Sequence, residues 1–427
     1  MHIQNFDPYH FSKKNIHGIP IFYKYLPWAP CIHTHFVFKT GALCDPEGKE
    51  GLAHFLEHMI GNGSPRFPDK KTVKEFNRLY MLNSRNAYTS YFSTVYFGKC
   101  LPEDFLSVLR MTIDTVFNPL LRPEDVEHER RVISQEAWGV YRNNKFLNYV
   151  KNWSDNIHHE NELRRLASPL GWPETIHSIS RADILQFHKE KYVKENLSIF
   201  IVGAITEEHL TLMENLTDKI PSGKKTKVSV GEIKKPKVSR HEIQSDEIGH
   251  PNEQVQFTLY RASHEMDKGD YETGVNMETL LYDILFERLR VEHSLCYHVA
   301  VKWNRNKFYC EAEISVNTSI DKIEIVEREI WNAINEIIEG KWRDRFDTLH
   351  TLNMKQLRSK ERLSDVVIQN SINEFVTTDS IRTLDEVLLS FKKVTYEKIQ
   401  EMIRYTFDPN YCFTEIILPT KKDSVEG

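Results

Sequence analysis

The order of predicted strands and helices runs twice along this chain of 427 residues, and no other feature constrains the fold as much. In the first half, apolar spacing predicts strands at 19–26, 33–40, within 82–100 and at 197–203, and helices around 54–59 and at 103–117, 123–141 and 181–192. In the second half it predicts strands at 255–260, within 297–316 and at 413–418, and helices at 277–291, 321–338, 343–363 and 396–405. Matching parts are offset by roughly 215 residues, which indicates an internal duplication.

A lysine-rich stretch separates the two halves. Seven basic residues lie between positions 224 and 240, among prolines and glycines at 221, 223, 231 and 236, and this composition is typical of a linker. A solvated connection is the simplest interpretation, and a basic handle for an acidic partner is the alternative. We therefore predict an α+β protein of two homologous α/β domains, each a mixed or antiparallel sheet flanked by helices, with an N-terminal domain at 1–222, a basic linker at 223–245 and a C-terminal domain at 246–427.

The overall composition narrows the classes of partner. The net charge of −5 and the pI of about 6.5 do not favour a nucleic-acid-binding protein. No apolar run is long enough to span a bilayer, and the first residues lack the basic start and apolar core of a signal peptide. The six cysteines are scattered and form no C-x-x-C pair, so they are expected to be reduced thiols. We expect a cytoplasmic protein with no nucleic-acid or membrane partner.

Two histidines four positions apart, His54 and His58, form the strongest chemical signal. On a helix they project from one face, one turn apart, and can hold one Zn²⁺ between them. Glu57 lies beside them and can take a proton from a water on the metal without being a ligand. The alternative is a helix with two partly buried, hydrogen-bonded histidines.

A catalytic zinc takes three protein ligands and keeps one open position, so a third ligand is expected from a second helix. The predicted helix at 123–141 offers Glu129 and Glu136, which are seven positions apart and lie on one stripe. Carboxylates beside Val132 and Ile133 are costly to bury unless they are paired or bound to a metal. A solvated charged face is the alternative, and the spacing leaves open which glutamate is the ligand.

The inverted order His-x-x-Glu-His, set in Gly51-Leu52-Ala53-His54-Phe55-Leu56-Glu57-His58-Met59, resembles the metal helix of the pitrilysin, insulysin and mitochondrial processing peptidase family. The resemblance implies that Glu136, 78 residues after His58, is the third zinc ligand and that Glu129 supports a ligand. It also implies that Asn86, Ala87, Tyr88 and Thr89 form an edge strand that binds substrate. The segments 171–176 and 201–203 match later landmarks of the family.

In the second half, Arg290 and Tyr297, with Leu295, resemble the family's substrate-binding Arg and Gly-Leu-x-Tyr element, although Ser294 replaces the usual glycine. At this length the chain resembles the branch whose subunits pair into a clamshell, each being one half. The resemblance implies that Arg290 and Tyr297 act on the partner's zinc site. A homodimer is the simplest expectation, because one chain carries the whole set, and a heterodimer with a related subunit is the alternative.

These expectations together describe a metalloendopeptidase with one Zn²⁺ per subunit. A zinc-activated water would attack the scissile bond of a peptide or an unfolded or leader segment, with Glu57 as general base and Arg290 and Tyr297 stabilising the oxyanion. Glu129 would orient a ligand, and the substrate would add as a β-strand along Asn86 to Thr89. The competing functions are a non-catalytic structural subunit and a carrier that encloses peptides without cutting them.

Overall fold

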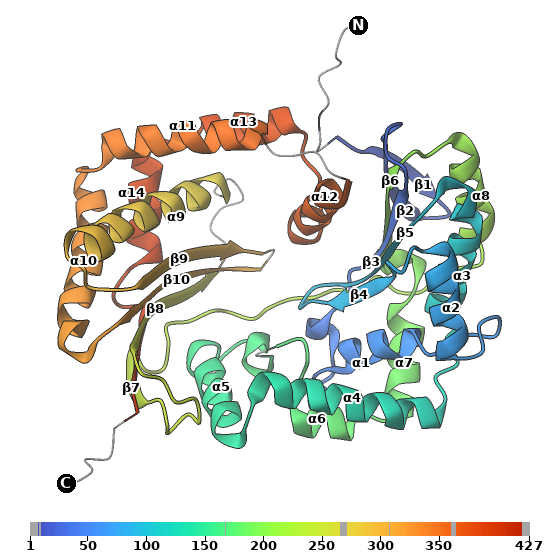
Figure 1. The fold of residues 1–427 in the computed structure, drawn as a ribbon, viewed down its shortest axis with the longest axis horizontal. Helices are drawn as coiled ribbons and strands as arrows, with labels where there is room; N and C mark the ends of the chain where they lie inside the picture. The colour runs from blue at the N-terminus through green and yellow to red at the C-terminus, as the bar shows by residue number, and fades with distance from the viewer. Residues whose placement is uncertain are drawn as a thin grey trace, which may run out of the picture. The chain divides into compact units, whose positions relative to one another are not determined.

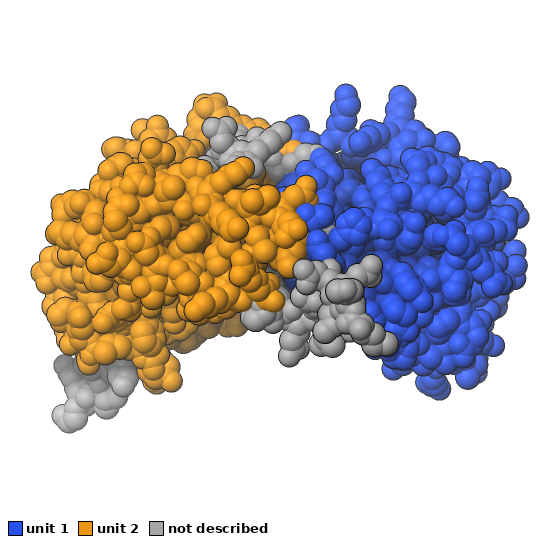
Figure 2. All heavy atoms as spheres, turned by 90° about the horizontal axis from the view of Figure 1, so that it is seen from above, with its two compact units in different colours: residues 1–140, 165–229, 361–383 blue, residues 141–164, 230–360, 384–427 orange. Residues whose placement is uncertain are grey.

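The structure is a computed structural model that describes residues 7, 10–166, 168–264, 271–306, 308–359 and 364–420. The chain forms two compact units, coloured separately in Figure 2. Unit 1 comprises residues 1–140, 165–229 and 361–383, and unit 2 comprises residues 141–164, 230–360 and 384–427. Neither unit is contiguous in sequence.

Unit 1 is built on a six-stranded mixed sheet with the strand order β1-β2-β6-β3-β5-β4. The strands are β1 (Ser12–Ile16), β2 (Ile19–Tyr25), β3 (Ile32–Phe38), β4 (Asn86–Thr89), β5 (Thr94–Cys100) and β6 (Leu197–Gly203). Strands β2 and β6 are parallel and the other neighbours are antiparallel. The central strands β3 and β6 are buried along their whole length, as expected for strands that are covered on both faces. Strand β4 pairs with β5 and forms one edge of the sheet within the described part of the chain.

Helices cover both faces of this sheet. The helices of unit 1 are α1 (Leu52–Ile60), α2 (Lys70–Tyr80), α3 (Phe105–Phe117), α4 (Pro123–Tyr141), α6 (Pro173–Ser178), α7 (Arg181–Lys191), α8 (Glu207–Thr217) and α12 (Ser364–Thr378). Figure 1 shows α12 on one side of the sheet and α3 and α8 on the other. Ile368, Ile372 and Phe375 of α12 pack against Phe22 and Phe200 in one buried cluster. A helix from the second half of the sequence thus covers a sheet from the first half.

Unit 2 contains a five-stranded sheet with the order β7-β11-β8-β10-β9. Its strands are β7 (Arg240–Gln244), β8 (Val255–His264), β9 (His298–Arg305), β10 (Tyr309–Thr318) and β11 (Phe413–Leu418), and its helices are α5 (Asn144–Ile157), α9 (Tyr271–Leu285), α10 (Ile323–Glu339), α11 (Arg343–Ser359), α13 (Leu384–Lys392) and α14 (Tyr396–Thr406). Residues of α9, α10 and α14 form the main core on one face. On the other face, Ile157 and Trp153 of α5 pack with Tyr260 and Phe413.

The predicted α+β architecture of two domains with mixed sheets is confirmed. The helix predicted at 123–141 and the strands predicted at 197–203 and 413–418 have the bounds of α4, β6 and β11. The helices α5 and α12 were not predicted, and each packs on the sheet of the unit that contains mostly the other half of the chain. The predicted domain boundaries at 222 and 246 stay a statement about the sequence duplication, because the compact units divide the chain differently.

The predicted linker at 223–245 has more structure than its composition suggests. Its last residues, Arg240–Gln244, form β7, which pairs in parallel with β11. Before this strand, Lys237 Nζ lies 2.6 Å from a carboxylate oxygen of Asp155 on α5, and Lys234 pairs with Glu160. An exposed edge strand of polar residues has no apolar alternation, so its composition does not distinguish it from a linker.

Two further expectations concern the chain as a whole. All six cysteines are thiols, as their scattered spacing predicted, and three of them are buried. Within the part of the chain that the structure describes, no helix is long and apolar enough to cross a bilayer.

Candidate metal centre

Helix α1 presents a polar stripe from an otherwise buried helix. Its residues Leu52, Ala53, Phe55, Leu56, Met59 and Ile60 are buried. The remaining positions are His54, Glu57 and His58, which share one face because they are three and four positions apart. The sequence therefore packs α1 by its apolar residues and leaves these three side chains at the surface of the core.

The start of α1 is held by a buried carboxyl group and a close backbone contact. Asp45 accepts hydrogen bonds from the backbone N–H groups of Gly51 and Ala53, both at 2.8 Å. A carboxyl group at this end of a helix satisfies N–H groups that have no partner within the helix, and burial raises the pKa of Asp45 to about 8. Gly171 packs against the same turn so closely that a Cβ on it would overlap the backbone oxygen of Glu50. Both features fix where the polar stripe of α1 lies.

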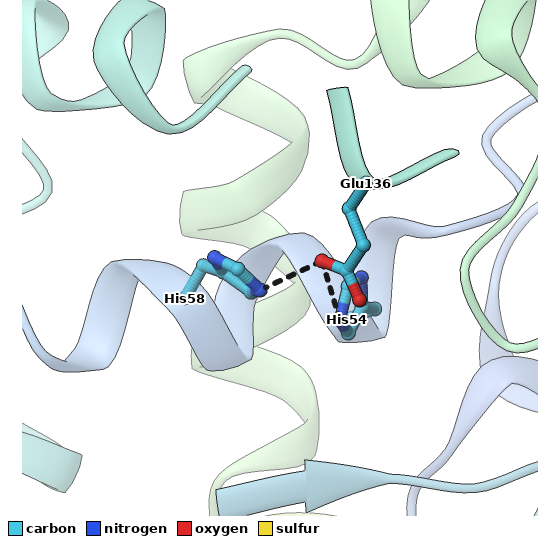
Figure 3. A group of neighbouring side chains, drawn as sticks. All are labelled: His54, His58 and Glu136. Atoms are coloured by element: carbon cyan, nitrogen blue, oxygen red, sulfur yellow. Dashed lines mark ion pairs between the residues drawn. The ribbon is translucent and has the colours of Figure 1, made fainter. Parts of the chain in front are cut away.

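His54, His58 and Glu136 converge on one point (Figure 3). One ligand atom from each lies within 4.8 Å of the others. The Glu136 Oε2 atom, from α4, is 3.9 Å from His54 Nε2 and 3.6 Å from His58 Nε2. Two ligands of a tetrahedral zinc are about 3.3 Å apart at normal bond lengths. The two nitrogen–oxygen distances, 3.9 and 3.6 Å, are therefore within about 0.6 Å of those between two ligands of one zinc ion.

Glu129 approaches His58 from the opposite side. Its carboxylate is almost fully buried, and Oε2 lies 3.2 Å from His58 Nδ1, while Lys70 Nζ donates to Oε1 at 2.7 Å. Burial opposes its ionisation, yet hydrogen bonds from His58 and Lys70 lower the pKa of Glu129 to about 2. An anionic partner on Nδ1 keeps the Nε2 lone pair directed at a metal. The geometry thus separates the two glutamates that spacing left equivalent and favours Glu136 as the ligand.

The two histidines differ in the partner of the Nδ1 atom and in the direction of the pKa shift. Among the described residues, the buried Nδ1 atom of His54 has no hydrogen-bond partner. Burial, together with the neighbouring His58, lowers the pKa of His54 to about 3, so this ring is neutral, which is the form that binds metals. Burial also favours the neutral form of His58, but the hydrogen bond to Glu129 and the charges of nearby carboxylates outweigh it and raise the pKa of His58.

Glu57 stands beside the metal group and outside it. Its side chain is half-buried, and Oε2 accepts a hydrogen bond from Thr89 Oγ1 at 2.7 Å. Burial raises the pKa of Glu57, although the bond from Thr89 acts in the other direction. A carboxylate with a raised pKa, beside three side chains that could hold a metal, suits a residue that accepts and returns a proton.

The predicted substrate-binding residues lie on the free edge of the unit 1 sheet. Asn86, Ala87, Tyr88 and Thr89 make up β4, which pairs with β5 and, among the described residues, with no other strand. The Asn86 side chain is exposed, and the Tyr88 hydroxyl accepts a hydrogen bond from Gln369 of α12 at 3.2 Å. The outer edge of β4 thus offers backbone groups to another strand.

Arg290 and Tyr297 come together in unit 2, and their relation to the metal group stays a prediction. The Arg290 guanidinium lies 5.4 Å from the centre of the Tyr297 ring, and Tyr297 is 75% exposed. Tyr297 is therefore not part of the core of unit 2. Ser294, at the position of the family's usual glycine, has a φ of +49°. The backbone there has the left-handed conformation that glycine adopts most readily, which accounts for the usual residue.

Sequence reasoning missed two contacts of this site. Lys70 follows the N-cap residue Asp69 of α2 and has no spacing relation to Glu129, 59 positions away. The hydroxyl of Thr89 was expected only as part of a strand that binds substrate, and its bond to Glu57 joins an edge strand to a helix. Contacts between separate elements leave no periodic signal in a sequence.

Two family models and several known proteins match this chain. A family model described as insulinase (peptidase family M16) matches residues 26–164, and one described as peptidase M16 inactive domain matches residues 178–345. An uncharacterized zinc protease of Rickettsia bellii is 24% identical over 358 residues, which are 81% of this chain and 82% of that protein. The β subunit of the mitochondrial-processing peptidase of Neurospora crassa is 24% identical over 266 residues, which are 62% of this chain and 54% of that protein.

Solved structures share the fold. The first half of the periplasmic protease PqqL from Escherichia coli has a TM-score of 0.81 to this chain at 17% identity, and the match covers 96% of this chain and 92% of that one. This likeness shows that the chain shares a fold of two sheet-plus-helix domains.

Proposed function

The chain belongs to the M16 family of peptidases, as its motifs predicted, and on this basis we propose that it is an active zinc metalloendopeptidase. The observation that carries the proposal is the convergence of His54, His58 and Glu136, with Glu57 on the same face of α1. Relatives named as zinc proteases support the choice of metal. One ion per subunit follows from one such group among the described residues.

The residues of this chain would divide the chemistry as follows. When bound, zinc supplies Lewis acidity, which polarises a carbonyl and lowers the pKa of a water toward neutrality. Glu57 accepts a proton from the attacking water and returns it to the leaving amine. Glu129, held by Lys70, keeps the His58 ring in its binding orientation. Arg290 and Tyr297 stabilise the negative charge that develops on the scissile carbonyl oxygen.

The proposed substrates are peptides and unfolded or leader segments. A strand added to the free edge of β4, along Asn86 to Thr89, would be held by main-chain hydrogen bonds, which are independent of side-chain identity. A folded protein rarely offers such an extended segment. The free edge therefore supports unfolded chains as substrates.

We further propose that the protein works as a cytoplasmic homodimer, with Arg290 and Tyr297 acting on the zinc site of the partner subunit. The similarity to one named subunit of the mitochondrial-processing peptidase makes a heterodimer the alternative. The mass of the active species in solution distinguishes a dimer from a monomer, and a fully active monomer would contradict the proposal. The PqqL relative is periplasmic, so the compartment needs its own measurement by cell fractionation.

The decisive experiment combines metal analysis with cleavage of a quenched fluorescent peptide. We expect about one zinc per chain, and cleavage that a chelator abolishes and added zinc restores. The Glu57→Gln variant should keep its zinc and lose at least about a hundredfold in kcat, because the general base is gone. Glu75→Gln, on the exposed face of α2, is the control and should cleave normally.

Two outcomes would contradict the proposal. Cleavage near the wild-type rate by Glu57→Gln would exclude the mechanism. Binding of peptides by the zinc-loaded wild-type protein without any cleavage would instead identify a peptide carrier, and the absence of both activities would favour a structural subunit.

A further inference from the structure

Thr89 is the last residue of the edge strand, yet its side chain is directed at α1. Its Oγ1 atom lies 2.7 Å from Glu57 Oε2 and 3.3 Å from Thr94 Oγ1. Thr89 and Thr94 face each other across the β4–β5 pair, next to the turn that joins the strands. One residue therefore belongs to the strand edge through its backbone and to the base Glu57 through its hydroxyl.

The single hydroxyl proton of Thr89 is directed at Glu57. Thr94 donates its own proton to the backbone oxygen of Thr40 at 2.9 Å, so its oxygen is left as an acceptor. The Thr89 hydroxyl can therefore donate either to the neutral Thr94 oxygen at 3.3 Å or to the Glu57 carboxylate at 2.7 Å. Hydrogen bonds to an ionised group are shorter and stronger, so the proton is given to Glu57.

The hydrogen bond between Thr89 and Glu57 lies next to the buried strand β5 and is carried by the edge strand β4. Thr94 is fully buried, and behind it the buried hydroxyls of Tyr96 and Tyr192 lie 2.7 Å apart. In the parts of the chain that the structure describes, β4 has a neighbouring strand on one side only, and an edge strand is held less firmly than a central one. The part of the network that can move is thus the strand that carries Thr89.

We propose that Thr89 is a positioning residue that couples occupation of the β4 edge to the orientation of the Glu57 carboxylate. A peptide that pairs with β4 gives the strand its second neighbour, fixes Thr89, and thereby fixes Glu57 for proton transfer. The inference rests on the proposed peptidase function and adds a link between substrate binding and catalysis. It makes long peptides better substrates in kcat, since binding energy far from the scissile bond is used to orient the base.

The first test compares Thr89→Val with Thr89→Ser. Valine keeps the β-branched shape and removes the hydroxyl, and we expect kcat to fall about 10–100-fold while KM changes less than about threefold. Zinc content and zinc affinity should be unchanged, because neither Thr89 nor Glu57 is a ligand. Serine keeps the hydroxyl and should restore most of kcat. A fall in zinc affinity, or a loss confined to KM, would overturn the proposal.

A matched control exists in the same sheet. Thr34 on β3 is buried and its hydroxyl has no hydrogen-bond partner among the described residues. Thr34→Val makes the same chemical change at a buried strand position, and we expect kcat to stay within about twofold of the wild type. A loss equal to that of Thr89→Val would show that the effect is general to the sheet and would overturn the assignment.

A second test needs no catalysis and separates this inference from the proposed function. In metal-free protein, the single variants Thr89→Val and Glu57→Gln and the double variant form a thermal unfolding cycle. We expect the shift in midpoint of the double variant to differ from the sum of the single shifts by about 2–4 °C, since the two side chains share one bond. Additive shifts would overturn the inference even if the protein is an active peptidase, and a coupled pair in an inactive protein would contradict the function alone.

A third test uses the wild-type protein and stays valid if a variant fails to fold. A series of peptides with one scissile bond and increasing length should show kcat rising at least about tenfold as residues that can pair with β4 are added. A series in which length changes KM and leaves kcat constant would overturn the proposal.

Discussion

Glu136 and Glu129 reach the same histidine from opposite sides, and this geometry supports the different roles that we propose for them. Glu136 lies 3.6 Å from His58 Nε2, whereas Glu129 lies 3.2 Å from Nδ1. We expect Glu136→Gln to lose zinc binding by several orders of magnitude, because it replaces an anionic ligand. Glu129→Gln should weaken zinc binding about 10–100-fold, the usual effect of losing a group that supports a ligand. Competition with a chromophoric chelator measures both.

The control for this comparison is Glu124→Gln, at the exposed start of α4. Its zinc affinity should equal that of the wild type. If Glu129→Gln lost more zinc than Glu136→Gln, the roles of the two glutamates would have to be exchanged.

How far the site could be predicted from the sequence depends on whether its residues share an element. His54, Glu57 and His58 lie on one helix, so their spacing alone placed them on one face. Spacing within α4 left Glu129 and Glu136 equivalent, because both lie on one stripe, and only packing against α1 distinguishes them. Lys70 and the Thr89 hydroxyl reach the site from α2 and β4, and spacing along a chain carries no distance between separate elements.

At the scale of elements, strand β3 carries a buried histidine, His35, in the middle of the unit 1 sheet. The His35 ring stacks on Phe97 with the ring centres 5.1 Å apart, and its Nδ1 atom has no partner among the described residues. Burial, and then the neighbouring His33, lower the pKa of His35 to about 3. The unfolded chain binds this proton near pH 6.5, so the unfolded state holds more protons between pH 6.5 and about 3.

This difference predicts that acid weakens the sheet. The contribution of His35 is fully present above pH 6.5 and is lost as the pH falls toward 3, by at most about 1.4 kcal/mol per pH unit. We expect His35→Phe to reduce the slope of unfolding free energy against pH in this window by about one proton. Urea unfolding of metal-free protein at several pH values measures the slope. His128→Phe, on an exposed face of α4, is the control, and an unchanged slope in His35→Phe would contradict the assignment.

Several elements, among them β7, α5 and α12, were not predicted from the sequence. The polar strand β7 has one apolar residue, Ile243, and therefore shows no alternation. Helix α5 does carry apolar residues at helical spacing, such as Phe146, Val150 and Ile157, so its periodicity was present in the sequence and was overlooked. By contrast, α4 begins with Pro-Glu-Asp, and β6 is an unbroken buried run, and both were predicted with the observed bounds.

At the scale of the whole molecule, the duplication and the compact units do not coincide. Residues 141–164, which include α5, belong to the unit built mainly from the second half, and residues 361–383, which include α12, belong to the unit built mainly from the first. Each half of the sequence thus contributes one helix to the other unit. The repeated order of strands and helices does not predict that α5 and α12 belong to the other unit, because it shows which elements are present and not which of them pack together.

This exchange predicts that the first half cannot fold alone. A fragment of residues 1–222 lacks α12, and Phe22 and Phe200 would lose the cover of Ile368, Ile372 and Phe375. An uncovered apolar sheet face leads to association in water, so we expect the fragment to aggregate or to bind a hydrophobic dye. Adding residues 361–383 through a flexible linker should restore a monodisperse, zinc-binding protein, as judged by light scattering and metal analysis. The control is the same linked chain with Ile368, Ile372 and Phe375 changed to serine, which should aggregate like the fragment. A monodisperse fragment 1–222 with normal zinc affinity would show instead that the sheet and the metal centre need no contribution from the second half.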